Sequence, residues 1–230
     1  MHPPPIADAP RRAWTRLTRL ALAAVLVAMA AALPAWDSDR MQRAAARLGP
    51  RASAAVRQLQ PLLQEWAALD ERSRLARVNE FYNRRIVFRD DMAVWGQEDY
   101  WASPLETLEK GAGDCEDFAI AKYFSLLAAG VPPQRLRLVY VQAQQGGPLG
   151  PWVPHMVLAW YAAPGAEPLV LDSLITGIRP ASGRPDLQPV FSFNGEGLWK
   201  GPVDQPAPDA LARFGRWHEV QAKARAEGFL

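Results

Sequence analysis

The chain has 230 residues, of which 49% are hydrophobic, 26 are Lys or Arg and 24 are Asp or Glu. This composition is that of a folded protein and excludes a disordered, collagen-like or coiled-coil chain. The single cysteine excludes an internal disulfide framework and any zinc or iron–sulfur site built from several thiolates. The length suits one domain with a sizeable core, or two small domains.

The net charge of +2 is concentrated at the N-terminus. Residues 1–35 carry four arginines and one aspartate, whereas the rest of the chain carries 22 basic and 23 acidic side chains. This nearly neutral remainder lacks the basic surface that nucleic-acid binding requires. No nucleic-acid partner is therefore expected.

An apolar run follows the N-terminal arginines. Residues 20–33 read LALAAVLVAMAAAL, and these fourteen residues are too few to span a bilayer, which takes roughly 20. Basic residues, a short apolar run and then small residues are typical of a secretory signal peptide. Residues 1–35 are expected to be such a peptide, which places the protein in the periplasm. The alternatives are an uncleaved membrane anchor and, from Arg11 and Arg12, twin-arginine export.

The chain beyond the signal segment begins with helical sequence. Residues 37–84 are rich in Ala, Arg, Leu and Gln, and Pro50 and Pro61 are expected to interrupt the helices there. Asp70 is expected to cap a helix over residues 71–85, because its carboxylate can accept hydrogen bonds from the free N–H groups of the first turn.

Two further helix signals follow. Ser103 and Glu106 have the spacing of a capping box, which predicts a helix start. Residues 118–129 include ten apolar side chains, and so wide an apolar stripe predicts a helix that is buried on most sides. Cys115 falls in the first turn of this central helix.

Strand signals dominate after residue 135. The expected strands cover residues 136–143, 155–161 and 169–172, and residues 144–154 are expected to form a loop. From Pro180 onward the chain is expected to be irregular as far as a last amphipathic helix over 209–227. Helices first and antiparallel strands second predict a single α+β domain over residues 36–230.

Cys115 has the setting of a nucleophile. A helix N-terminus favours the thiolate, and a nearby imidazole would complete its activation. Beyond the signal segment the histidines are His155, which begins a strand, and His218. Asp172 ends the next strand and could orient the imidazole of His155. Cys115, His155 and Asp172 form a coherent thiol triad, although each residue taken alone is more often structural.

Three carboxylates surround the cysteine. Asp114, Glu116 and Asp117 would raise the pKa of the thiol through like charge. One interpretation is acidic capping of the helix N-terminus. The other is a Ca²⁺ site, in which oxygen ligands gather and the bound ion cancels the repulsion of the thiolate.

These residues lie in segments that resemble the bacterial transglutaminase-like cysteine proteinases. The matching segments run in order from about Arg77 to Lys200. They are 94–101 (VWGQEDYW), 111–118 (GAGDCEDF), 155–158 (HMVL), 169–172 (LVLD), 179–182 (RPAS) and 193–197 (FNGEG).

The resemblance implies a papain-like/transglutaminase-like cysteine proteinase core. In it Cys115 is the nucleophile, His155 the general base and Asp172 its orienter. The resemblance also implies calcium dependence, with Asp114, Glu116 and Asp117 matching the acidic cluster of the family.

The resemblance further implies that the substrate is a large cell-surface adhesin, cut near its N-terminus at a di-alanine site so that biofilm disperses. It also implies that the inhibitor is an inner-membrane receptor that senses cyclic-di-GMP and sequesters the protease. Two rival functions stay open: a transglutaminase-type acyl transferase with the same triad, and a non-catalytic calcium-dependent binding module. Trp95, Trp101 and Trp152 are candidates for the groove walls or the receptor surface.

Overall fold

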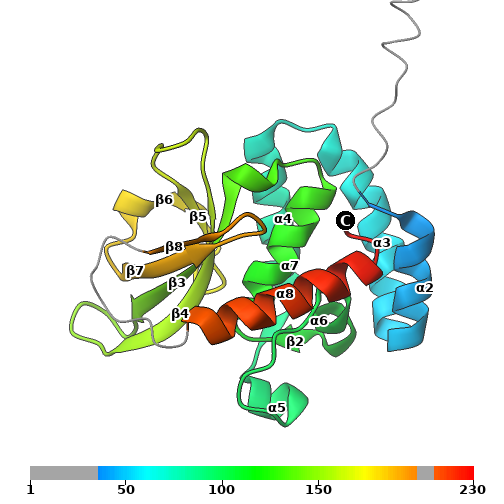
Figure 1. Cartoon of the computed structure of the whole chain (residues 1–230), viewed down its shortest axis with the longest axis horizontal. Helices are drawn as coiled ribbons and strands as arrows, with labels where there is room; N and C mark the ends of the chain where they lie inside the picture. Colours follow the sequence, from blue (N-terminus) through cyan, green and yellow to red (C-terminus); the bar gives the residue numbers. More distant parts are fainter. Residues whose placement is uncertain (1–35, 201–209) are drawn as a thin grey trace, which may run out of the picture. The chain divides into compact units, whose positions relative to one another are not determined.

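The computed structural model describes residues 36–200 and 210–230, so the predicted signal segment at 1–35 lies outside the described residues. Helices gather on one side of the molecule and an antiparallel sheet on the other (Figure 1). The predicted α+β arrangement, with helices first and strands second, is confirmed. In the described part of the chain, no helix is both long and apolar enough to cross a membrane.

The first three described helices are α2 (Ser38–Leu48), α3 (Pro50–Ala67) and α4 (Glu71–Arg85). Asp70 caps α4 as predicted, since its side chain accepts from the backbone N–H of Ser73 at 3.1 Å. Pro61 was expected to interrupt the helical segment, and this prediction is wrong because Pro61 lies inside α3. The burial of Leu59, Leu63 and Trp66 against the core outweighs the one helical hydrogen bond that proline removes.

The middle of the chain carries the helix that bears the cysteine. Its elements are β1 (Val87–Phe88), α5 (Asp91–Trp95), α6 (Pro104–Lys110), β2 (Ala112–Gly113) and α7 (Cys115–Ala128). The capping box of Ser103 and Glu106 starts α6 as predicted. Nearly all of α7 is buried, as its apolar sequence predicts, and Gly130 follows it with a φ of 85° that suits glycine.

The six strands of the sheet lie in the order β6-β5-β4-β3-β7-β8. They are β3 (Leu136–Gln144), β4 (Trp152–Trp160), β5 (Leu169–Leu171), β6 (Arg179–Pro180), β7 (Leu187–Phe193) and β8 (Leu198–Lys200). The expectation of irregular chain after Pro180 is therefore wrong. The strand β7 pairs with β3, and Pro189 is accommodated where the register shifts between Tyr140 and Val141. A proline lacks the N–H that a regular ladder needs, but it fits at a bulge.

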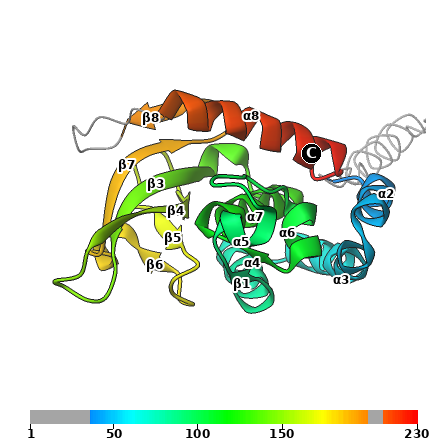
Figure 2. The same ribbon diagram turned by 90° about the horizontal axis from the view of Figure 1, so that it is seen from below.

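One hydrophobic core joins the helices to the inner face of the sheet. The last helix, α8 (Ala210–Ala226), runs along this junction beside β7 and the other helices (Figure 2). Its Trp217 packs against Tyr123, Phe124 and Phe193, with ring centroids 5.1–5.5 Å apart. The expected C-terminal amphipathic helix is thus present and closes the core.

The end of α8 also caps α6. The carboxylate of Glu227 accepts hydrogen bonds from the hydroxyl of Ser103 and from the backbone N–H of Leu105, the latter at 3.2 Å. Burial raises the pKa of Glu227 to about 7 even though both hydrogen bonds favour its ionised form. The folded protein therefore holds the Glu227 proton more tightly than the unfolded chain does.

This difference predicts a pH dependence of stability. As pH rises from about 4.5 to about 7, the unfolded chain releases the Glu227 proton first, so the free energy of unfolding falls. The Glu227→Gln variant cannot titrate, and its free energy of unfolding should fall less over this range, by on the order of 2 kcal/mol. Urea unfolding across this pH range measures the effect, with the exposed Glu219→Gln as a control on the same helix. Equal pH dependence in wild type and Glu227→Gln would contradict it.

Candidate active site

The strand register brings the predicted histidine and aspartate to one face of the sheet. Leu158 of β4 pairs with Leu171 of β5, so the next pair in register is Val157 with Asp172. His155 lies two residues from Val157 and therefore on the same face as Asp172. Diagonal neighbours of this kind are within reach of a long side chain.

The two side chains meet in a buried hydrogen bond. His155 Nε2 lies 2.7 Å from Asp172 Oδ1, and the residues are only 3% and 1% exposed. This contact with Asp172 uses Nε2 and not the second ring nitrogen, Nδ1. An ionised Asp172 accepts only, so it selects the tautomer that carries the proton on Nε2 and a lone pair on Nδ1.

Cys115 enters the same site from α7. It is the first residue of the helix and only partly buried. A cleft of about 270 Å³ is lined by Cys115 and His155, together with Tyr140, Pro154, Met156 and several acidic residues. The three residues of the predicted triad thus come from α7, β4 and the end of β5, and two of them share one cleft.

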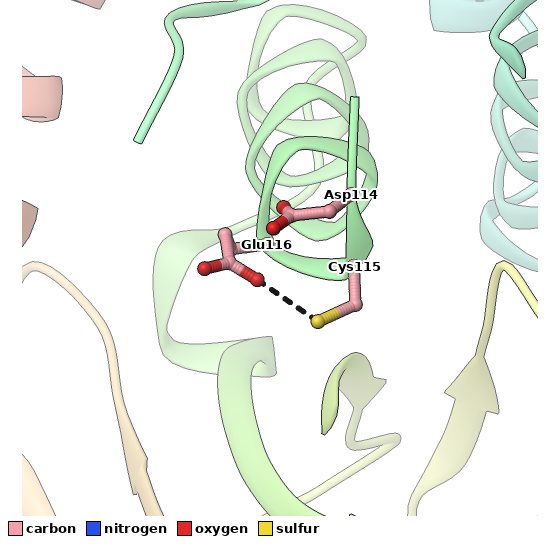
Figure 3. A group of neighbouring side chains, drawn as sticks. All are labelled: Asp114, Cys115 and Glu116. Atoms are coloured by element: carbon pink, nitrogen blue, oxygen red, sulfur yellow. Dashed lines mark hydrogen bonds between the residues drawn. The ribbon is translucent and has the colours of Figure 1, made fainter. Parts of the chain in front are cut away.

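The surroundings of the thiol favour its protonated form. Its Sγ donates to Glu116 Oε2 at 2.9 Å, with Asp114 beside them at the start of the helix (Figure 3). Burial raises the pKa of the Cys115 thiol well above its ordinary value, and the charges of Glu116 and Asp114 raise it further. The backbone N–H of Met156 opposes this shift but does not reverse it. A nucleophile in this setting needs a compensating positive charge.

The acidic residues are arranged in overlapping groups whose ligand atoms lie within 4.8 Å of one another. One group joins carboxylate oxygens of Asp91, Asp114 and Asp117, and another joins Asp91, Asp99 and Glu116. A third group joins Asp114 and Glu116 to the Cys115 thiol. We call the five carboxylate residues the acidic cluster.

The outer oxygens of the cluster are held by backbone donors. Asp91 Oδ2 accepts from the N–H of Tyr100 at 2.5 Å, and Asp117 Oδ1 accepts from the N–H of Ala102 at 2.8 Å. The other oxygens, Asp91 Oδ1, Asp117 Oδ2 and Asp114 Oδ1, are buried and make no hydrogen bond with the described residues. Buried polar atoms without a partner are rare in folded proteins. An oxygen-only set of this kind fits a hard divalent cation.

Burial and the repulsion between neighbouring carboxylates both raise pKa values within the acidic cluster. Burial, followed by the charges of Glu116 and Asp117, raises the pKa of Asp114 to about 10. Burial, followed by nearby carboxylates and opposed by the Tyr100 N–H, raises the pKa of Asp91 to about 6. Carboxylates packed this closely oppose ionisation unless a cation joins them.

Sequence reasoning missed Asp91 and Asp99. They precede Cys115 by 24 and 16 residues, and only the pairing of β1 with β2 and the loop after α5 bring this segment against α7. No local signal in the sequence marks Asp91 or Asp99 as neighbours of Cys115, because their approach depends on this long-range packing. Of the tryptophans, Trp101 is buried against Phe193 instead of lining the cleft.

A family model and several solved structures both match this chain. The model of the family described as bacterial transglutaminase-like cysteine proteinase BTLCP matches residues 55–184. A search of curated proteins gave no match. The solved structure of Legionella pneumophila LapG is 36% identical, with 82% of this chain and 97% of the LapG chain covered and a TM-score of 0.68.

Two further structures of that protein match equally well. Calcium-bound LapG is 36% identical with a TM-score of 0.68, over 81% of this chain and 98% of LapG. EGTA-treated LapG is 36% identical with a TM-score of 0.69, over 82% and 97%. Since the family match spans more than half of the chain and the LapG match nearly all of LapG, the chain belongs to the bacterial transglutaminase-like cysteine proteinases and is a cysteine peptidase.

Proposed function

We propose that this cysteine peptidase is a calcium-dependent periplasmic endopeptidase in which Cys115 is the nucleophile, His155 the general base and Asp172 its orienter. It cuts the N-terminal region of a large cell-surface adhesin at a di-alanine site and so promotes biofilm dispersal. The observation that carries the proposal is the cleft shared by Cys115 and His155, with Asp172 hydrogen-bonded behind the imidazole and the acidic cluster beside the thiol.

The chemistry follows from this arrangement. His155 Nδ1 takes the thiol proton, and the Cys115 thiolate attacks the scissile carbonyl. The C–N bond breaks as the imidazolium gives its proton to the leaving amine, which leaves an acyl-enzyme. Water then adds to the acyl carbon, with His155 again as base, and releases the acid and the free thiol. The backbone N–H of Cys115, at the start of α7, is placed to stabilise the oxyanion, because the first N–H groups of a helix have no partner inside it.

The acidic cluster supplies the calcium site in this proposal. Asp91, Asp114 and Asp117 would hold the ion with their unpaired oxygens, and Glu116 and Asp99 lie beside them. When bound, Ca²⁺ supplies positive charge that offsets the repulsion between these carboxylates and a thiolate at Cys115. The calcium-bound structure of LapG, a protein 36% identical to this chain, supports the choice of ion.

Location and regulation are proposed from the sequence. The segment at 1–35 has the form of a signal peptide, which agrees with a periplasmic site of action. An inner-membrane receptor that senses cyclic-di-GMP would hold the protease inactive. The resemblance to the family supports both the adhesin substrate and this receptor.

Loss of the thiol should abolish cleavage. Purified wild type, Cys115→Ala and His155→Ala are incubated with an N-terminal adhesin fragment in calcium, and products are identified by mass spectrometry. Wild type should yield two fragments, whereas both variants should lose at least about 100-fold in rate because nucleophile and base are gone. His218→Ala is the matched control, since His218 is an exposed residue of α8. Receptor binding should persist in Cys115→Ala.

The same reaction separates the rival functions. Retained cleavage by Cys115→Ala would refute the thiol mechanism. An amine-linked product in excess amine, in place of two fragments, would identify an acyl transferase. Calcium binding without any cleavage by the wild type would favour the non-catalytic binding module.

The calcium site predicts opposite effects of one substitution with and without the ion. Asp91→Asn removes one repelling charge but keeps an acceptor for the N–H of Tyr100. The raised pKa of Asp91, about 6, means that its ionised form destabilises the calcium-free protein at neutral pH. In EGTA the variant should therefore melt at a higher temperature than wild type, and in calcium at a lower one.

Calorimetric titration with Ca²⁺ completes this test. Asp91→Asn should bind calcium at least about tenfold more weakly, because the site loses one charged ligand. Asp90→Asn is the control, since Asp90 is exposed and lies outside the acidic cluster. Equal calcium affinity in Asp91→Asn and wild type would remove Asp91 from the site.

A further inference from the structure

The aspartate of the triad has a second charged partner that its role does not explain. Arg184 follows the short 3₁₀ helix η2 (Ala181–Gly183), and its Nη2 lies 2.7 Å from Asp172 Oδ2. The arginine is only 5% exposed, and the Asp172 side chain is fully buried. A charged pair at this depth is not an incidental surface contact.

The two oxygens of Asp172 are divided between two tasks. Oδ1 lies 2.7 Å from His155 Nε2 and accepts from the backbone N–H of Leu174 at 3.0 Å. Oδ2 faces the guanidinium of Arg184. Oδ2 makes no hydrogen bond with the described residues, so Arg184 acts on this oxygen through the ion pair. If the carboxylate turned, it would lose both this ion pair and the contact with the imidazole.

Arg184 is itself held rigidly. Its Nε and Nη2 donate to the two oxygens of Asp186 at 2.9 and 2.7 Å. Its backbone N–H donates to Ala181 at 3.0 Å, and its carbonyl accepts from the N–H of Leu187 at 3.1 Å. These contacts hold the positive charge of Arg184 at a fixed position beside the buried carboxylate.

Other groups hold the backbone of Asp172 and not its carboxylate. Lys122 of α7 and Asn83 of α4 both donate to the Asp172 carbonyl, at 3.0 and 2.8 Å. Burial alone would raise the pKa of Asp172, but His155, the Leu174 N–H and Arg184 together lower it to about 2. Arg184 is therefore the cation that meets the carboxylate from the side opposite the imidazole.

We propose that Arg184 is a positioning residue of the active site, which fixes the orientation and the negative charge of Asp172 so that His155 keeps its proton on Nε2. This proposal rests on the roles proposed above for Cys115, His155 and Asp172. Without Arg184, the buried carboxylate loses its ion pair at Oδ2 and either takes up a proton or rotates. Both changes release the imidazole from a single tautomer.

The test uses Arg184→Gln and Arg184→Lys in the otherwise unchanged protein. Arg184→Gln should lower kcat at least about tenfold with little change in KM, because the substrate does not touch Arg184. Arg184→Lys, which keeps the charge but not the planar fork, should fall between Arg184→Gln and wild type. Arg135→Gln is the matched control, since Arg135 forms an ion pair of 2.7 Å with Glu71 at the other end of β4.

A second measurement needs no catalysis. ¹⁵N-edited NMR of the imidazoles reports the tautomer of each histidine, and the chain has only three. His155 should be protonated on Nε2 in wild type and in Arg135→Gln, and should become a mixture of tautomers in Arg184→Gln. A structural defect elsewhere would not change this signature.

Arg184→Gln with wild-type kcat and a single Nε2–H tautomer would overturn the proposal. If Arg184→Gln does not fold, the same wild-type values in Arg184→Lys would overturn it. The tautomer readout also separates this proposal from the proposed function. An incorrect substrate assignment would leave the NMR result intact, whereas an unaltered tautomer would refute the positioning role alone.

Discussion

The crowding of buried carboxylates around one thiol is the constraint on which the rest of this site depends. Cys115 gains the N-terminus of α7, which favours a thiolate, but it also gains Asp114 and Glu116, which oppose one. Burial, followed by the charges of Glu116 and Asp114, raises the pKa of the thiol. The unpaired oxygens of Asp91, Asp114 and Asp117 show where a compensating cation would act. In the proposed function, activity and ion binding are therefore coupled through charge.

A second electrostatic arrangement surrounds Asp172, the residue behind the imidazole of His155. The negative charge of Asp172 is balanced by His155, the Leu174 N–H and the ion pair with Arg184. The two arrangements differ in their charge balance. The carboxylates beside the thiol have no cation among the described residues, whereas Asp172 has the guanidinium of Arg184 at 2.7 Å from Oδ2 and the imidazole of His155 at 2.7 Å from Oδ1.

Local signals in the sequence predicted most of the helices and several strands. Asp70 and the pair Ser103 and Glu106 start their helices as expected, because capping depends on neighbouring residues. The predictions around Pro61 and Pro189 are wrong, because regular structure contains both prolines. Tertiary packing stabilises the helix that contains Pro61, and a bulge accommodates Pro189 in its strand. Neither the packing nor the bulge can be predicted from the neighbouring sequence.

In the candidate site, too, some residues could be assigned from the sequence and others depend on long-range packing. His155 and Asp172 could be paired from the sequence because they lie on consecutive strands, and the structure joins them at 2.7 Å. Asp91 and Arg184 could not be assigned, since they reach the site from segments whose positions depend on long-range packing. Arg184 lies in a region that was expected to be irregular, so its approach to Asp172 required β6 and β7 to be known.

The reactivity of Cys115 tests the central claim most directly. Cys115 is the only cysteine in the chain, so alkylation by iodoacetamide reports this thiol alone and requires no substrate. Alkylation rates are compared at one neutral pH in calcium and in EGTA. If the cation offsets the carboxylate charge, calcium should raise the rate by about tenfold or more, because the thiolate is the reactive form. An equal or slower rate in calcium would contradict the coupling of ion binding to the nucleophile.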